Sequence, residues 1–237
     1  FGGPPETASF SIAAGDIAFL RGPESAMETV YRELTGEEYE PAVVETPAID
    51  DLERAVDTIV HMKNLSELAV DLAYSSVLFD DAELAEEVSN LEVEVDNLES
   101  RFEAWVLGAA ADADDPVSLR GLIHLGTSTE VISDAALDIS EGVIRQITVH
   151  PVVQLAVQES DEIISRAKIA AGSRLDGTGV TNGVPDADAT MSIIAIRRPE
   201  AGWLLVADAD AELHSGDIVI AKGTQTAAEA FETLATG

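Results

Sequence analysis

Cysteine is absent from the 237 residues of this chain. Its absence excludes disulfide scaffolds, thiolate zinc sites, cysteine nucleophiles and cysteine-ligated iron–sulfur clusters. Long apolar runs are also absent, because none approaches the roughly 20 residues that a membrane-spanning helix needs. The chain begins with Phe rather than Met, and we therefore expect it to be a fragment of a longer protein.

Positive charge is scarce: 13 Lys and Arg residues stand against 45 Asp and Glu residues, which gives a formal net charge of −32. This balance argues against binding to nucleic acid or to an anionic membrane, since both require a basic surface. The hydrophobic content of 46% is too high for a disordered chain. Lysine occurs only at Lys63, Lys168 and Lys222. The acid excess and the few lysines are typical of a halophile's cytosolic protein; an acidic calcium-binding surface is the alternative, but no D-x-D-x-D-G loop supports it.

Motifs of nucleophilic catalysis and of phosphate-binding loops are missing too. The sequence contains no G-x-S-x-G, no G-x-x-x-x-G-K-[ST] and no G-x-G-x-x-G. The histidines His61, His124, His150 and His214 have no zinc-site spacing and do not accompany a serine nucleophile motif. We therefore expect a protein that is not an enzyme and requires no cofactor.

The two ends of the chain resemble each other. GDIAFLRGPESAMETVYRELTG (15–36) aligns without gaps on GDIVIAKGTQTAAEAFETLATG (216–237), with eight of 22 positions identical. Each copy predicts a Gly-Asp turn, a short apolar strand and an Ala-containing helix. Because the second copy closes a domain, we expect the first copy to be the tail of an equivalent domain.

The middle of the chain has the hydrophobic spacing of long helices. A proline-containing linker over 37–48 precedes predicted helices over 49–79, 82–111 and about 117–147, and HPVV at 150 begins a shorter helix ending near 160. The stripe on the second helix includes Leu84, Val88 and Leu91 at spacings of three and four. Long helices joined by short loops predict an antiparallel bundle.

The pattern changes to short β segments after residue 162. Strands are predicted over 163–170, 191–198, 203–207 and 216–223, with a turn or short helix over 172–180 and a closing helix over 224–235. Strands paired by a hairpin and covered by a helix make a small α+β domain.

The segments GSRLDGTGV, IIAIRR, AGW and GDIVIAKG occur in that order between residues 162 and 237. On these motifs, this last region resembles the C-terminal domain of the RCK/TrkA family. The helical region resembles an archaeal PhoU-like domain, on MKNLSELAVDLAYSSVLFDDAELAEEV and STEVISDAALDI. The pair is similar to haloarchaeal proteins of the PhoU–TrkA-C type. The predicted fold class is therefore α+β, with a three- or four-helix PhoU-like bundle followed by a small TrkA-C-like domain. The predicted domains are the tail of a preceding TrkA-C-like domain (1–36), the linker (37–48), the bundle (49–160) and the TrkA-C-like domain (161–237).

Two regulatory functions follow from the resemblance. The TrkA-C-like domain implies a non-enzymatic, cytoplasmic sensor of a small ligand that regulates potassium or cation transport, with a transporter or channel as partner. The PhoU-like bundle implies the alternative, a phosphate-transport signalling adaptor that can hold metal on E/D-x-x-x-D motifs. In both cases the protein could lie against a membrane transporter.

A second quasi-repeat supplies candidate metal ligands. Ser66-Glu67-x-x-x-Asp71-x-Ala73 on the first predicted helix matches Thr129-Glu130-x-x-x-Asp134-x-Ala136 on the third. Carboxylates four residues apart share one helical face, so two such helices could surround a divalent metal or iron. The candidates are Glu67, Asp71, Glu130, Asp134 and Asp138. The alternative is a solvated or intersubunit polar face, because this spacing is common by chance in so acidic a chain.

Basic residues concentrate in the C-terminal region, at Arg166, Lys168, Arg174, Arg197, Arg198 and Lys222. A local positive patch could receive an anionic ligand such as a nucleotide, and our candidates are Arg174, Arg197 and Arg198. The alternative is a set of ordinary salt bridges. The apolar stripe on the second helix and Trp105 also predict more apolar surface than one helical layer buries, and hence a homodimer.

Overall fold

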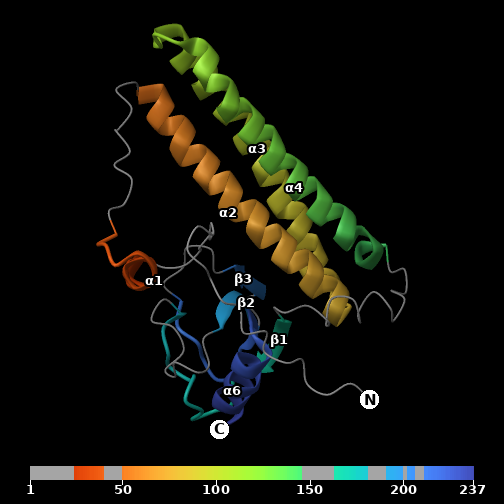
Figure 1. Ribbon diagram of the computed structural model, residues 1–237. Helices are drawn as coiled ribbons and strands as arrows, with labels where there is room; N and C mark the ends of the chain where they lie inside the picture. Colours follow the sequence, from red (N-terminus) through yellow and green to blue (C-terminus); the bar gives the residue numbers. More distant parts are fainter. Residues whose placement is uncertain (1–23, 40–49, 146–162, 181–190, 200–201, 206–210) are drawn as a thin grey trace, which may run out of the picture. The chain divides into compact units, whose positions relative to one another are not determined.

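The computed structural model describes residues 24–39, 50–145, 163–180, 191–199, 202–205 and 211–237 (Figure 1). The chain divides into two compact units, Phe1–Thr46 and Pro47–Gly237. The described part of the first unit contains one helix, α1 (Glu24–Thr35). The described part of the second contains a bundle of long helices and a small antiparallel sheet.

Three long helices form the bundle: α2 (Asp50–Phe79), α3 (Ala82–Asp112) and α4 (Arg120–Ile144). They run side by side as rods (Figure 1). The apolar stripe predicted on the second helix is buried, since Leu84, Val88 and Leu91 are at most 4% exposed. Successive helices run in opposite directions (Figure 1), so the expected antiparallel arrangement of these three helices is confirmed.

A two-residue turn reverses the chain between α2 and α3. Asp80 has a positive φ of 50°, a conformation that short polar side chains tolerate. Asp81 caps α3, because its carboxylate accepts a hydrogen bond from the Leu84 N–H at 3.3 Å. The turn therefore falls at the Asp-Asp pair that interrupts the helical pattern of the sequence.

The start of α4 differs from the prediction of one helix from about residue 117. Pro116–Leu119 forms a separate 3-10 turn, η1, which Asp115 caps by accepting from the Val117 N–H at 3.1 Å. The tighter turn is stabilised by a hydrogen bond from the Ser118 N–H to the Asp115 carbonyl. The shorter helix predicted over 150–160 lies outside the described residues.

The sheet has the strand order β1-β4-β2-β3, and all neighbours are antiparallel. The predicted hairpin is confirmed by the pairing of β2 with β3. The pairing of β2 with β4 is irregular between Ile193 and Ala195, which marks a bulge. The strands and the closing helix are β1 (Ile163–Lys168), β2 (Ser192–Arg198), β3 (Gly202–Leu205), β4 (Ile218–Gly223) and α6 (Gln225–Thr236).

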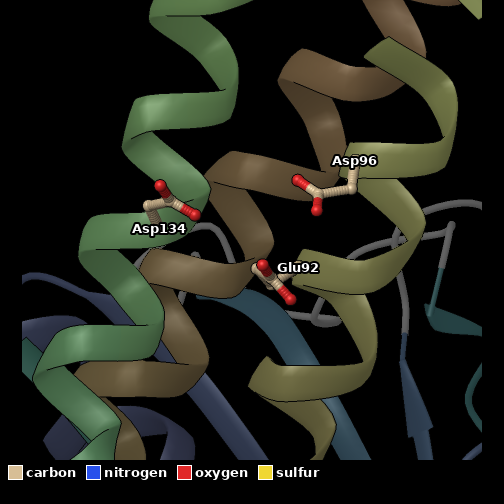
Figure 2. Close-up of side chains that lie close together, drawn as sticks. All are labelled: Glu92, Asp96 and Asp134. Atoms are coloured by element: carbon tan, nitrogen blue, oxygen red, sulfur yellow. The ribbon is translucent and has the colours of Figure 1, made fainter. Parts of the chain in front are cut away.

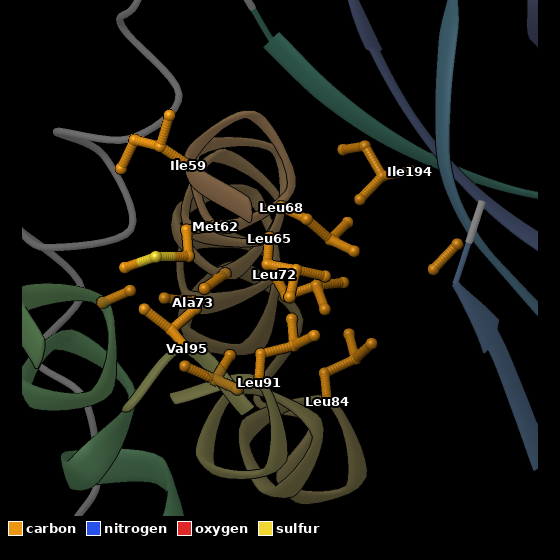
Figure 3. Packing of buried hydrophobic residues seen from close by; sticks show 14 of the residues in the cluster. Ile59, Met62, Leu65, Leu68, Leu72, Ala73, Leu84, Leu91, Val95 and Ile194 are labelled. Carbon is orange, nitrogen blue, oxygen red and sulfur yellow. The ribbon is translucent and has the colours of Figure 1, made fainter. Parts of the chain in front are cut away.

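The two faces of the sheet are both buried, against different partners. On β4, Val219 and Ala221 belong to an apolar cluster with α6, whereas Ile220 belongs to the cluster of the bundle. Ile194 of β2 joins the same bundle cluster, together with Leu68 of α2 (Figure 3). Successive side chains of a strand point to opposite faces, so a continuous apolar strand is what this two-sided burial requires.

The terminal repeat is visible in the helices. α1 and α6 occupy the aligned positions of the two copies, and each is followed by a glycine with positive φ, Gly36 at 75° and Gly237 at 96°. In both cases the glycine N–H donates to the carbonyl four residues earlier. The predicted strand of the first copy lies outside the described residues, so its place in a preceding domain stays a prediction.

The α+β class and the expected helical bundle are thus confirmed. The identity of the small sheet domain as TrkA-C-like stays a prediction, as do the domain boundaries. Within the described residues, no helix is both long enough and apolar enough to cross a bilayer.

Candidate functional site

Carboxylates from α3 and α4 come together on one side of the bundle. Glu92 and Asp96 lie four residues apart on α3 and therefore share a face, which Asp134 of α4 meets (Figure 2). One carboxylate oxygen from each of the three side chains lies within 4.8 Å of the others. Glu92 is half-buried, and the two aspartates are exposed.

Burial and the repulsion between these acids both raise pKa values in this group. Burial and the charges of Asp96 and Asp134 raise the pKa of Glu92 above its usual range. Burial, the charge of Asp134 and the charges of Glu99 and Asp96 do the same for the pKa of Glu130, which neighbours the group on α4. The folded protein therefore holds at least these carboxylates closer than their charges favour.

The acidic stripe on α3 continues for two further turns. Glu99 and Glu103 follow Asp96 at spacings of three and four residues, which keeps them on the same face. Burial, Glu103, Asp96 and Asp134 raise the pKa of Glu99, while a hydrogen bond with Thr127 of α4 partly offsets the rise. We call Glu92, Asp96, Glu99, Glu130 and Asp134 the acidic cluster.

The donors of the acidic cluster are all oxygen atoms. Carboxylate oxygens suit hard cations such as Mg²⁺, Ca²⁺ and Mn²⁺, and carboxylate-rich bundles can also hold iron. A cation placed between Glu92, Asp96 and Asp134 would offset the burial and the repulsion that together raise the pKa of Glu92. The residues present therefore fit a divalent metal in charge and in donor chemistry.

The metal ligands predicted on α4 and those predicted on α2 lie in different surroundings. Asp134 and Glu130 lie in the acidic cluster, and Asp138 is exposed one turn further along α4. Glu67 pairs with Lys63, with the Lys63 Nζ 3.2 Å from a carboxylate oxygen. Asp71 pairs with Lys222 of β4, whose Nζ lies 2.7 Å from Oδ2. Among the described residues, neither α2 acid joins a three-ligand group with the α4 acids.

The packing of α2 on α4 explains why the two repeat copies separate. The hydroxyl positions of the repeat are buried, and the Ser66 hydroxyl donates to the Thr129 carbonyl at 3.1 Å. The alanine positions, Ala73 and Ala136, are fully buried. Small residues at these positions allow the two helices to approach closely, which is a structural reason for the similarity. The acids beside them consequently face different neighbours, the sheet for Asp71 and α3 for Asp134.

Sequence reasoning missed Glu92 and Asp96. Their segment, LEVEVD (91–96), carries the same E-x-x-x-D spacing as the repeat. It lacks the Ser/Thr and Ala positions of that repeat, so a search based on matching neighbours does not find it. A search for the E-x-x-x-D spacing alone would find this segment, but it would also find many acid pairs that share the spacing by chance.

Of the predicted ligand-binding arginines, Arg198 has an extensive set of partners within the sheet domain. Its guanidinium donates to both oxygens of Asp217, at 3.2 and 2.9 Å, and to the Glu212 carbonyl at 2.8 Å. Asp217 is only 1% exposed and also accepts from the His214 N–H at 2.9 Å. Burial by itself raises the pKa of the Asp217 carboxyl, but the hydrogen bonds from Arg198 and His214 outweigh it, and the pKa lies below its usual range.

Arg197 and Arg174 have different surroundings. Arg197 pairs with Glu83 of α3, with 2.7 Å between Nη2 and the carboxylate, and its guanidinium lies 5.9 Å from the centre of the Trp203 ring. Arg174 is exposed in the segment between β1 and β2.

Among the residues that the structure describes, three ion pairs join the bundle to the sheet, each with its acid on the bundle. They are Asp71–Lys222, Asp81–Arg166 and Glu83–Arg197. Half of the basic residues noted in this region therefore contact the acidic bundle. This arrangement accounts for part of their concentration without any ligand.

Residues 59–143 match the family model of the PhoU domain. The match spans most of α2, all of α3 and nearly all of α4, and it includes every residue of the acidic cluster. A search of curated proteins found no match. The helical bundle is thus PhoU-like.

Proposed function

We propose that this chain is a non-enzymatic regulatory adaptor of the PhoU type that acts in phosphate-transport signalling in the cytoplasm. The observation that carries the proposal is that the PhoU match includes two E-x-x-x-D segments, Glu92–Asp96 and Glu130–Asp134, which meet between α3 and α4. The adaptor would act as a homodimer and would contact a phosphate transporter or its signalling partner.

In this proposal the acidic cluster holds a divalent cation or iron. Glu92, Asp96 and Asp134 would supply the ligands, and Glu130 and Glu99 would lie beside them as further acceptors. When bound, the cation supplies positive charge where the carboxylates repel one another. The residues of α3 and α4 would then be drawn together, so that cation binding stabilises the bundle.

Cation binding tests the proposal directly. Purified chain freed of metal with a chelator is titrated with Mn²⁺, Mg²⁺ or Fe²⁺ (the last without oxygen), and binding is followed by calorimetry and by thermal unfolding. The expected result is saturable binding and a raised melting temperature, both strongly reduced by Asp96→Asn and Asp134→Asn. Glu86→Gln is the matched control, because this α3 glutamate is exposed and lies outside the acidic cluster. Equal responses from all three variants and the unchanged chain would reject the site.

A second candidate function is a ligand-sensing regulator of potassium or cation transport. It is favoured by the C-terminal motifs that resemble TrkA-C, whose IIAIRR and GDIVIAKG segments form the adjacent strands β2 and β4. The two candidates predict different partners. Copurification with a phosphate permease would support the first, and copurification with a potassium or cation transporter would support the second.

A further inference from the structure

A cleft of about 600 Å³ opens where the sheet meets the first turn of α3. Its walls include three basic side chains, Lys168, Arg197 and Arg198, and one acidic side chain, Glu83. This is an unusual excess of positive charge in a chain whose net charge is −32. A cleft of this volume is large enough for a small organic ligand rather than a single ion.

Strand register places two of the bases in one row across the sheet. Lys168 of β1 and Arg197 of β2 both lie opposite Ile218 of β4, one on each side. Residues directly opposite each other point to the same face, and strands are about 4.8 Å apart, so the two backbones lie about 10 Å apart. Trp203 of β3 extends the row beyond Arg197. Two cations thus flank Ile218, an apolar residue of the cleft lining, and Trp203 lies beyond Arg197, outside that lining.

The two cations of this row differ in their present partners. No hydrogen bond or ion pair joins Lys168 to any other residue that the structure describes, and its side chain is exposed. Arg197 binds the carboxylate of Glu83, a side chain that is itself 55% exposed. The carboxylate of Glu83 thus occupies the position on Arg197 that an anionic ligand would take. Arg198, by contrast, is held by the buried Asp217 and borders the cleft without being available.

We propose that this cleft binds a small organic phosphate, whose phosphate group contacts Lys168 and Arg197 and displaces Glu83. The guanidinium fork of Arg197 matches phosphate oxygens as well as it matches a carboxylate, and Lys168 adds a charge that no described residue pairs. The remaining part of the ligand lies over Ile218, which lines the cleft. This site is separate from the acidic cluster and does not depend on the proposed cation.

Displacement of Glu83 would couple the cleft to the bundle. Glu83 lies in the first turn of α3, two residues after the capping residue Asp81. Arg197 cannot hold both the ligand and Glu83 with the same hydrogen-bonding groups. Ligand binding therefore removes one of the three ion pairs that join the bundle to the sheet, which favours the arrangement with looser contact.

The test uses the whole chain with inorganic phosphate and ADP as probes, at fixed salt concentration. Binding is measured by calorimetry and by the fluorescence of Trp203 in a Trp105→Phe background, which leaves a single tryptophan. We expect saturable binding of both probes at concentrations up to about 10 mM, with ADP bound more tightly because it also contacts Ile218. Equal affinities would overturn the assignment of an organic ligand, and no saturable signal with either probe would overturn the site.

Two exposed variants keep the test independent of folding. Lys168→Ala should weaken binding of both probes at least about fivefold, through loss of a charge-assisted contact. Glu83→Gln should tighten binding by about two- to fivefold, because it removes an internal competitor held by an exposed ion pair. Arg101→Ala, which changes an exposed arginine of α3 outside the cleft lining, is the matched control and should leave affinity unchanged. Unchanged affinity in both Lys168→Ala and Glu83→Gln would place any observed binding elsewhere.

Discussion

Replacing Arg198 by alanine would leave the Asp217 carboxylate buried with the His214 N–H as its remaining described donor. Breaking a buried ion pair by removing one partner costs about 3–5 kcal/mol. Because the Arg198 side chain is 32% exposed, water can reach part of the vacated space, and we expect the lower end, about 3 kcal/mol. This would be a large part of the 5–15 kcal/mol typical of a folded domain.

The assay is urea unfolding at neutral pH in the Trp105→Phe background, followed by the fluorescence of Trp203 on the strand that pairs with β2. Arg174→Ala is the control, since an exposed surface substitution usually changes the free energy of unfolding by no more than about 0.5 kcal/mol. Asp217→Asn and the double variant complete a cycle. The double variant should lose less than the sum of the two single losses, because each single change leaves a buried partner unsatisfied.

The pH dependence gives the sign of the same interaction. The folded-state pKa of Asp217 is depressed, so its contribution to stability is present above the unfolded pKa of about 3.9. That contribution is lost as the pH falls through the folded pKa. The difference between unchanged chain and Arg198→Ala should therefore shrink in strong acid. If Arg198→Ala behaves like Arg174→Ala at neutral pH, the pair is not structural and the reasoning fails.

The remaining predictions concern the bundle. Gly126→Ala should destabilise the bundle by up to about 2 kcal/mol, because the new Cβ would lie 2.5 Å from Cε1 of the fully buried Phe102. The matched change Gly142→Ala meets open space and should stabilise α4 by up to about 1 kcal/mol. Equal melting temperatures of the two variants would contradict this packing. The pKa values of Glu92, Glu99 and Glu130 are raised, so their stabilising contribution is full below their unfolded pKa of about 4.3 and is lost as the pH rises through the folded values. The free energy of unfolding, measured with urea at a series of pH values without added divalent metal, should therefore fall less with rising pH in Asp134→Asn than in Glu86→Gln. Parallel pH profiles of the two variants would refute the repulsion between these acids.

Helical spacing predicted the bundle well because each helix has a single buried stripe and clear ends. The Asp-Asp turn between α2 and α3 and the apolar strands of the sheet could be located for similar reasons. The burial of Phe102 against Gly126 could not, since it depends on how closely two helices approach. The 3-10 turn before α4 was also missed, because Pro116 is equally suited to the first turn of an α-helix.

The candidate sites were less predictable because they depend on the rotation and register of elements. Asp71 and Asp134 have matching sequence surroundings, but the rotation of α2 directs Asp71 to Lys222 of the sheet. Lys168 and Arg197 are 29 positions apart in the sequence, and only the central place of β4 puts them on either side of Ile218. A pattern along one helix or strand cannot supply such information.

Because the chain has only three lysines, chemical labelling of lysine can report on three separate parts of the structure. Lys63 pairs with Glu67 on α2, Lys222 bridges from the sheet to Asp71, and Lys168 lines the cleft. An amine-reactive label read by mass spectrometry would therefore report on a single helix, on the bundle–sheet contact and on cleft occupancy through three separate peptides. The side chain of Lys222 is 29% exposed and that of Lys63 is 53% exposed, so Lys222 should be labelled more slowly. An increase in the labelling rate of Lys222 relative to that of Lys63 would show that the sheet has separated from the bundle.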